Sequence, residues 1–319
     1  MAKESLNRQA SQKADAPGTK SMFLAPGMVR ALFFHGALLP ALNAKPMSVG
    51  HYENFPVASV LLPRRLRAAI AVIYCFARSA DDIADEGDAS DEERLAGLAA
   101  YRAQLIRISS GRSPAALPAP EMFAALAEVI RAHRLPVQLF EDLLDAFSQD
   151  VAQKRYADFA QVRDYCRRSA NPVGRLILHL YGAVSDAALV QSDAICTSLQ
   201  LINFCQDVGV DFAKHRIYLP KDSLTRFGVA ESDFAAGRAD AGFRALMTFE
   251  VARARQLMYA GAPLVKVLRG RAGWELRLVV QGGLRILEKI EKVGYDIFNQ
   301  RPVLGACDWP LMAWRALRM

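Results

Sequence analysis

Long segments with helical periodicity, separated by short breakers, are the feature that most restricts how this chain can fold. Apolar residues recur every three or four positions, as at Leu66, Ile70 and Ile73, which is the pattern of an amphipathic or buried helix. The predicted helices cover 64–86, 91–109, 121–134, 136–151, 158–168, 172–182, 187–212, 241–267 and 272–298. Runs of alternating β-branched residues, which would predict strands, are missing. The sequence therefore predicts an all-α fold.

Three parts of the chain differ in character. Residues 1–46 are predicted to be a disordered or weakly structured extension, because 1–20 are polar and rich in Ser, Lys and Gln. Within that part, 22–42 are apolar but interrupted by prolines and basic residues, so they are too broken to span a membrane. A short amphipathic anchor on the membrane surface is the alternative for this segment. Residues 47–305 are predicted to be one helical domain, and 306–319 a C-terminal tail.

Charge and cysteine usage limit the partners and the compartment. The net charge of +7 and the isoelectric point near 9.2 suit a polyanionic substrate, an acidic membrane surface or a nucleic acid. Nucleic acid is disfavoured, because no basic run is interleaved with aromatic residues and no zinc-finger spacing occurs. The five cysteines stand singly, which predicts free thiols in a reducing compartment. We therefore expect a cytoplasmic protein, with peripheral contact at the inner face of the membrane as an alternative.

Two of the predicted helices carry a polar stripe along one face. The first stripe consists of Tyr74, Arg78, Asp81 and Asp85. The second consists of Gln200, Asn203, Asp207 and Asp211. Steps of three and four residues return to the same face of a helix. Both helices are otherwise apolar and are predicted to be buried, so the stripes are predicted to face each other across a central cavity.

Such a pair of acidic stripes suits several Mg²⁺ ions and a diphosphate. Mg²⁺ takes one or two carboxylates and bonds substrate phosphate oxygens, while a guanidinium such as that of Arg78 can donate to the remaining oxygens. Either aspartate pair alone is better explained by a solvated helix face, but two such pairs on apolar helices favour a metal site. A di-iron site is disfavoured because no Glu-x-x-His occurs. The chain also lacks a G-x-G-x-x-G fingerprint, which counts against Rossmann-type NAD(P) binding.

The two acidic segments resemble the motifs of a known family. D-D-I-A-D-E at 81–86 is similar to the first aspartate-rich motif of the squalene/phytoene synthases, and N-F-C-Q-D-V-G-V-D-F-A-K-H-R-I-Y-L-P at 203–220 to the second. The resemblance runs from about His51 to Arg301. It implies a single-domain isoprenoid-synthase helical bundle and Mg²⁺-dependent ionisation of a prenyl diphosphate.

The resemblance also assigns roles to particular residues. Metal binding falls on Asp81, Asp85, Asp207 and Asp211. Binding of the isoprenoid diphosphate falls on His51, Asn54, Tyr74, Arg78, Gln200, Asn203 and Arg216. Catalytic roles near the carbocation fall on Tyr165 and Tyr218, and for the expected reaction Asn171 or Tyr165 is predicted to hold the water that captures the cation. For Asn171 a purely structural alternative is equally open, namely the N-cap of a helix that has Pro172 at its first position.

Departures from the family pattern narrow the expected reaction. Gln206 stands where the family has an arginine, and Glu53 and Asn54 stand where a basic residue and a serine are common. Fewer cations make a second diphosphate harder to hold, so the resemblance points to the branch that converts presqualene diphosphate into hydroxysqualene in hopanoid biosynthesis. That branch implies no NADPH and functional coupling to a separate presqualene diphosphate synthase. The alternatives are a synthase that joins two prenyl diphosphates to presqualene diphosphate, squalene or phytoene, and a noncatalytic helical protein that binds prenyl lipids.

Overall fold

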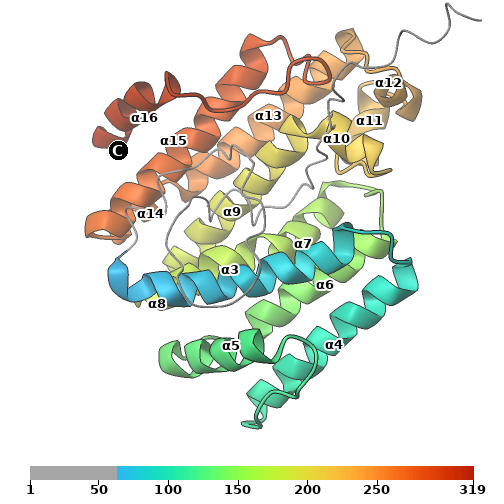
Figure 1. Cartoon of the computed structure of the whole chain (residues 1–319). Coiled ribbons are helices and arrows are strands. Elements are labelled where there is room, and N and C mark those ends of the chain that lie inside the picture. Colours follow the sequence, from blue (N-terminus) through green and yellow to red (C-terminus); the bar gives the residue numbers. More distant parts are fainter. Residues whose placement is uncertain (1–62) are drawn as a thin grey trace, which may run out of the picture.

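The computed structural model describes residues 63–319, which form helices joined by short loops (Figure 1). In chain order the helices are α3 Arg64–Asp85, α4 Asp91–Ser109, α5 Pro120–His133, α6 Gln138–Ala152, α7 Phe159–Ser169, α8 Asn171–Tyr181, α9 Asp186–Gln206, α10 Val208–Ala213, α11 Lys221–Arg226, α12 Glu231–Ala235, α13 Ala241–Gly261, α14 Leu264–Val267, α15 Gly270–Lys292 and α16 Asp308–Leu317. Within 63–319 the only strand-like pairing is an isolated bridge between Arg155 and Ile217. The predicted all-α fold is confirmed. His51, Asn54 and the 1–46 extension lie outside the described residues.

Helix starts follow local capping chemistry. At α4 the hydroxyl of Ser90 accepts from the backbone N–H of Glu93, and the Glu93 carboxylate accepts from the Ser90 N–H, which forms a capping box. Three further helices have an N-cap side chain that accepts from the backbone N–H three residues on. These N-caps are Asp158 for α7, Ser185 for α9 and Asp240 for α13. These side chains satisfy donors that have no partner inside the helix.

Two of the long predicted helices are divided. The segment 187–212 breaks at Asp207, which has a ψ of 16° between α9 and α10, although Asp207 and Asp211 still donate to the carbonyls four residues before them. The segment 241–267 breaks before Pro263 into α13 and α14, because proline lacks the N–H that a continuing helix needs. Helices α11, α12 and α16 were not predicted. Of these, α16 lies in the tail 306–319 and buries Met312 and Ala316.

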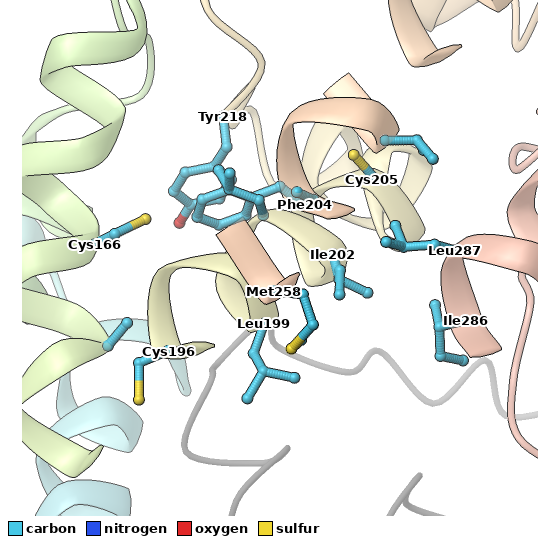
Figure 2. Close-up of a cluster of buried hydrophobic side chains, with 14 of the residues drawn as sticks. Cys166, Cys196, Leu199, Ile202, Phe204, Cys205, Tyr218, Met258, Ile286 and Leu287 are labelled. Carbon is cyan, nitrogen blue, oxygen red and sulfur yellow. The ribbon is translucent and has the colours of Figure 1, made fainter. Parts of the chain in front are cut away.

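Two hydrophobic cores hold the helices together. One lies among α3, α4, α5, α6 and α8, where the rings of Phe123 and Phe140 meet that of Phe76 edge to face at centroid distances of 6.0 and 5.4 Å. The other surrounds α9, which lies between α7, α8, α13 and α15 in Figure 1. Figure 2 shows Leu199 and Ile202 of α9 beside Met258 of α13. The fold thus buries α9, the helix that carries the second polar stripe.

None of the helices within residues 63–319 has the length and apolar character that crossing a membrane requires.

Candidate active site

The first acidic stripe lies at the end of α3, and the two aspartates differ in their partners. Asp85 is held by Arg216, whose Nη2 lies 2.6 Å from Oδ1, and by Lys214, whose Nζ lies 3.3 Å from Oδ2. Burial alone would raise the pKa of Asp85, but these two cations lower it below its usual value. Among residues 63–319, the ion pair of Asp81 is a 3.5 Å contact with Arg78. Burial and the nearby charge of Asp85 raise the pKa of Asp81 to about 7.

A third carboxylate, Asp150 of α6, lies between the two stripes. It accepts hydrogen bonds from the hydroxyls of Tyr165 and Tyr218, with O–O distances of 2.6 and 2.8 Å. Its backbone carbonyl accepts from Arg216 at 3.1 Å. Burial raises the pKa of Asp150 to about 6, and the charge of Arg216 opposes that rise. The two catalytic tyrosines predicted from the resemblance are therefore anchored on one buried carboxylate.

The second stripe occupies the junction of α9 and α10. The guanidinium of Arg301 donates to both carboxylate oxygens of Asp207. Its Nε lies 2.5 Å from Oδ1 and its Nη2 lies 3.2 Å from Oδ2, so the pair is bidentate. Asp211 is 2% exposed. Burial, and then the charge of Asp207, raise the pKa of Asp211 well above its usual value. Arg301 thus pairs with Asp207, while the charges of Arg216 and Lys214 oppose the rise in the pKa of Asp211.

The two stripes belong to one charged cluster. Arg216, which is paired with Asp85, also influences the pKa of Asp211, and so does Asp150. Asp150 in turn raises the pKa of Asp81. The predicted approach of the two acidic segments is therefore present in the structure, with Arg216 and Asp150 between them.

Three buried polar atoms of the cluster lack a hydrogen-bond partner within the described part of the chain. They are Oδ1 of Asp211, Oε1 of Gln200 and Nε of Arg216. A buried polar group without a partner is costly, and these atoms are free to bond a ligand. Two oxygen acceptors fit Mg²⁺, and a guanidinium N–H fits a phosphate oxygen. No cluster of three or more potential metal ligands is preformed in residues 63–319, so diphosphate and water oxygens would complete the coordination of an ion.

Aromatic rings lie directly beside the charged cluster. Phe204 stacks on Tyr218 with a centroid distance of 4.0 Å and an interplanar angle of 5°, as Figure 2 shows. Tyr165 and Tyr156 approach Tyr218 at 5.6 and 5.7 Å. The faces of such rings attract cations. The arrangement therefore places cationic and acidic groups, which suit a diphosphate and its metal ions, beside rings that suit a positive charge.

The remaining predicted site residues take different positions. Tyr74 and Asn203 are half-buried, and Tyr74 lies close enough to Arg78 to affect the pKa of that guanidinium. Asn171 begins α8 rather than capping it, since Ala170 is the N-cap. The N-cap alternative for Asn171 is therefore wrong, and its Oδ1 instead accepts a 3.0 Å hydrogen bond from Thr197 of α9.

Sequence reasoning missed Asp150 and Arg301. Asp150 had a readable signal, because it falls three and seven residues after Phe147 and Leu143, on the buried face of α6. A carboxylate in such a position is costly unless it has partners. Arg301 gave no local signal, since it lies 94 residues from Asp207. Gln206 stands where the family pattern has an arginine, so no cation was expected at this position. The Gln206 side chain is buried and donates to the carbonyl oxygen of Pro302. The adjacent Arg301 brings a guanidinium to this part of the site, and that guanidinium is paired with Asp207.

Comparison with known proteins agrees with this geometry. The family model for squalene/phytoene synthase matches residues 49–308. The chain is 34% identical to the hydroxysqualene synthase of Sinorhizobium fredii over 239 residues, which covers 75% of this chain and 78% of that protein. It is also 34% identical to the hydroxysqualene synthase of Rhodopseudomonas palustris, covering 83% of this chain and 88% of that one. The crystal structure of squalene synthase HpnC from Alicyclobacillus acidocaldarius matches with a TM-score of 0.70 and 39% identity, over 77% of this chain and 90% of that one.

The helical bundle is therefore that of an isoprenoid synthase. More narrowly, the chain belongs to the squalene/phytoene synthase family, whose members process isoprenoid diphosphates.

Proposed function

We propose that this protein converts presqualene diphosphate into hydroxysqualene. In the proposed reaction the carbon–oxygen bond to the diphosphate breaks, with its electron pair leaving on the diphosphate. The cyclopropylcarbinyl cation rearranges, and the oxygen of a water molecule bonds to the resulting carbocation and gives up a proton to the released diphosphate. No reductant is consumed, so NADPH is not required.

The observation that carries the proposal is the amide of Gln206 at the junction of α9 and α10. The family pattern has a guanidinium here, but Gln206 is neutral and its Nε2 is bound to the Pro302 carbonyl oxygen. Arg301 provides one cation nearby, and that cation is paired with Asp207. This end of the site then suits one diphosphate better than two. The relatives named hydroxysqualene synthase, at 34% identity, support the same choice.

Magnesium is the cofactor that the donor set fits. Carboxylates on both sides of the site would bind the ions, with diphosphate oxygens as further ligands. These carboxylates are Asp81 and Asp85 on one side and Asp207 and Asp211 on the other. When bound, the ions would neutralise the charge that develops on the departing diphosphate. One aspartate of each pair is held by protein cations, so Arg216 and Arg301 would turn from Asp85 and Asp207 towards the diphosphate. Arg78 would add further donors.

The tyrosines anchored on Asp150 are suited to handling water. The hydroxyl of Tyr165 donates a hydrogen bond to Asp150. The lone pairs of the Tyr165 oxygen therefore remain free to accept a hydrogen bond from a water molecule. That bond would orient the water and increase its nucleophilicity. The stacked rings of Phe204 and Tyr218 would stabilise the carbocation by about 0.5–2 kcal/mol for each contact. Asn171, tied to Thr197, is a second polar group that could hold the water.

The test is to incubate purified protein and Mg²⁺ with presqualene diphosphate in ¹⁸O-labelled water. We expect hydroxysqualene that carries the label in its hydroxyl group, without added NADPH. A matched incubation with farnesyl diphosphate alone should yield no C30 product. Hydroxysqualene or squalene formed from farnesyl diphosphate alone would overturn the assignment.

A second candidate is a synthase that joins two prenyl diphosphates. It is favoured by the solved relative described as a squalene synthase and by Arg301, which restores a cation beside the second motif. The farnesyl diphosphate incubation distinguishes it directly. A noncatalytic prenyl-lipid-binding protein predicts instead that Asp81→Ala and Asp207→Ala leave all ligand processing unchanged, whereas the proposed enzyme loses turnover in both variants.

A further inference from the structure

Helix α14 and the first turns of α15 form an exposed corner that is rich in cations. Lys266, Arg269 and Arg271 are all exposed there. In the part of the chain from 63 onward, no ion pair joins any of the three to a carboxylate. We refer to Lys266, Val267, Arg269, Arg271, Trp274 and Arg277 as the basic corner. Its cations are available to a partner outside the chain.

Apolar side chains lie among these cations. Val267 is 48% exposed and Trp274 is 37% exposed. Arg271, Trp274 and Arg277 follow one another at three-residue steps, so they share a face of α15. The guanidinium of Arg277 lies 5.3 Å from the centre of the Trp274 ring. An exposed indole flanked by arginines is typical of side chains that sit at a membrane–water interface.

The turn between α14 and α15 is packed too closely to open easily. A Cβ atom on Gly273 would lie 2.1 Å from the carbonyl oxygen of Leu268 and 3.3 Å from that of Val265. Only glycine permits this approach, which holds the exposed end of α14 against the start of α15. The basic corner is therefore a fixed surface and not a loose loop.

The same side of the molecule continues onto α16. Gln281 lies two turns beyond the exposed indole on α15, and its Nε2 is 3.1 Å from the sulfur of Met319. Helix α16 exposes Trp314 and Leu317, at 48% and 66%, and the guanidinium of Arg318 lies 3.7 Å from the Trp314 ring centre. Figure 1 shows α14, the start of α15 and α16 along one side of the molecule. A second arginine–tryptophan pair thus lies near the basic corner.

Little negative charge opposes these cations. From residue 262 to 287 the chain has a single carboxylate, Glu275. Burial raises the pKa of Glu275 to about 8, so this group is largely uncharged near neutral pH. The segment 262–287 therefore carries a net positive charge, which favours an anionic partner.

We propose that the basic corner, extended by α16, docks this protein on the surface of an anionic lipid membrane. The cations would contact lipid phosphates, while Trp274 and Val267 would enter the boundary between headgroups and acyl chains. An acidic protein could satisfy the cations, but it would not require exposed indoles flanked by arginines. The choice of lipid also rests on the proposed function, because the substrate and product carry isoprenoid chains that dissolve in a bilayer.

Vesicle co-sedimentation of the full chain tests the proposal. Wild-type protein should bind vesicles that contain phosphatidylglycerol, bind vesicles of phosphatidylcholine alone much more weakly, and dissociate as salt is raised. A variant with Lys266→Glu, Arg269→Glu and Arg271→Glu should lose partitioning by about tenfold or more. Trp274→Ser should lower partitioning severalfold while leaving its salt dependence unchanged.

The matched control reverses three exposed cations elsewhere, on the α4–α5 side, with Arg112→Glu, Arg131→Glu and Arg134→Glu. It changes the net charge equally and should bind like the wild type. Equal loss in both triple variants, or wild-type binding by the corner variant, would overturn the proposal. So would size-exclusion data showing that the corner joins two copies of the chain. Melting curves check that each variant is folded, and none of these measurements depends on turnover.

Discussion

Asp150 shows how much a single side chain organises in this site. It is buried to 7% exposure and accepts from two tyrosine hydroxyls, while Arg216 donates to its backbone carbonyl. A buried carboxylate needs such partners because its charge is expensive to desolvate. Asp150 is thereby placed to fix the orientation of Tyr165 and Tyr218 together.

The ionisation of Asp150 should be visible in the pH dependence of stability. Its pKa rises from 3.8 to about 6 on folding, so between these values the folded protein holds a proton that the unfolded chain has released. The free energy of unfolding should therefore fall as pH rises from about 4 to about 6, at up to about 1.4 kcal/mol per pH unit from this group. Chemical denaturation at a series of pH values should show a shallower fall in Asp150→Asn. Parallel curves for wild type and variant would contradict this account.

Asp211 allows a test that separates binding from folding. Its Oδ1 has no partner within the described residues, and its pKa is raised well above the usual value. Replacement by the neutral and isosteric Asn should leave the melting temperature unchanged or higher, because a repulsion with Asp207 is removed. If Asp211 binds metal, turnover should nevertheless fall by about 100-fold or more.

The matched variant for Asp211→Asn is Asp145→Asn. Asp145 is 44% exposed at its side chain and pairs with Arg102 of α4, and exposed pairs contribute little. Wild-type turnover is expected in Asp145→Asn. Similar turnover in both variants would show that Asp211 is not a ligand.

At the scale of elements, α9 is the helix on which the site depends. It carries Gln200 and Asn203, ends at the junction that holds Asp207, and packs along α13. Contact with α13 is close at Gly261, where an added Cβ would lie 2.5 Å from the Gln191 carbonyl oxygen and 2.5 Å from Cγ1 of Ile195. The axes of α9 and α13 can therefore approach this closely because Gly261 has no side chain.

Gly261→Ala should separate the two helices and lower stability by about 1–3 kcal/mol, because the clash is with backbone as well as side-chain atoms. Gly209→Ala in α10 is the control, since its Cβ would meet only Phe298 at an ordinary 3.5 Å. The control should be neutral or more stable, as Ala favours helix over Gly by about 1 kcal/mol. Urea unfolding monitored by circular dichroism compares the two. Equal stability of both variants would show that α9 and α13 tolerate a larger separation.

At the scale of the whole molecule, the first and second acidic segments belong to different cores. Asp81 and Asp85 end α3, which packs in one core, whereas Asp207 and Asp211 follow α9, which packs in the other. Arg216 and Asp150 connect the two sides. Any ligand bound by both aspartate pairs should therefore stabilise the folded molecule as a unit.

Mg²⁺ and inorganic pyrophosphate added together should raise the melting temperature more than the sum of their separate effects. At about 100 times the dissociation constant, binding only to the folded state adds about 2.7 kcal/mol, which corresponds to roughly 5–10 °C for a chain of this size. Differential scanning fluorimetry measures the shift, which should disappear in Asp207→Asn. A shift that persists in that variant would place the ligands elsewhere.

The parts of the site that could be predicted from the sequence are those whose residues lie three or four positions apart in the chain. The stripes of α3 and α9 could be recognised because residues three and four apart share a helix face. The partners of those aspartates could not, because Arg301 lies 94 residues from Asp207 and Arg216 lies 131 residues from Asp85. The break at Asp207 was equally hidden, since the hydrogen bonds on both sides of it are helical.

By itself, the sequence determined the helical class, most helix boundaries and the two acidic segments, because each depends on periodicity and capping within a few residues. Only the tertiary structure decided how those segments are neutralised. It brought Arg216 and Arg301 to the aspartates, placed Asp150 beneath two tyrosines, and left atoms of Gln200 and Asp211 without partners. These contacts depend on how the helices pack, since the free energy of a buried charge is set by neighbours that the local sequence does not specify.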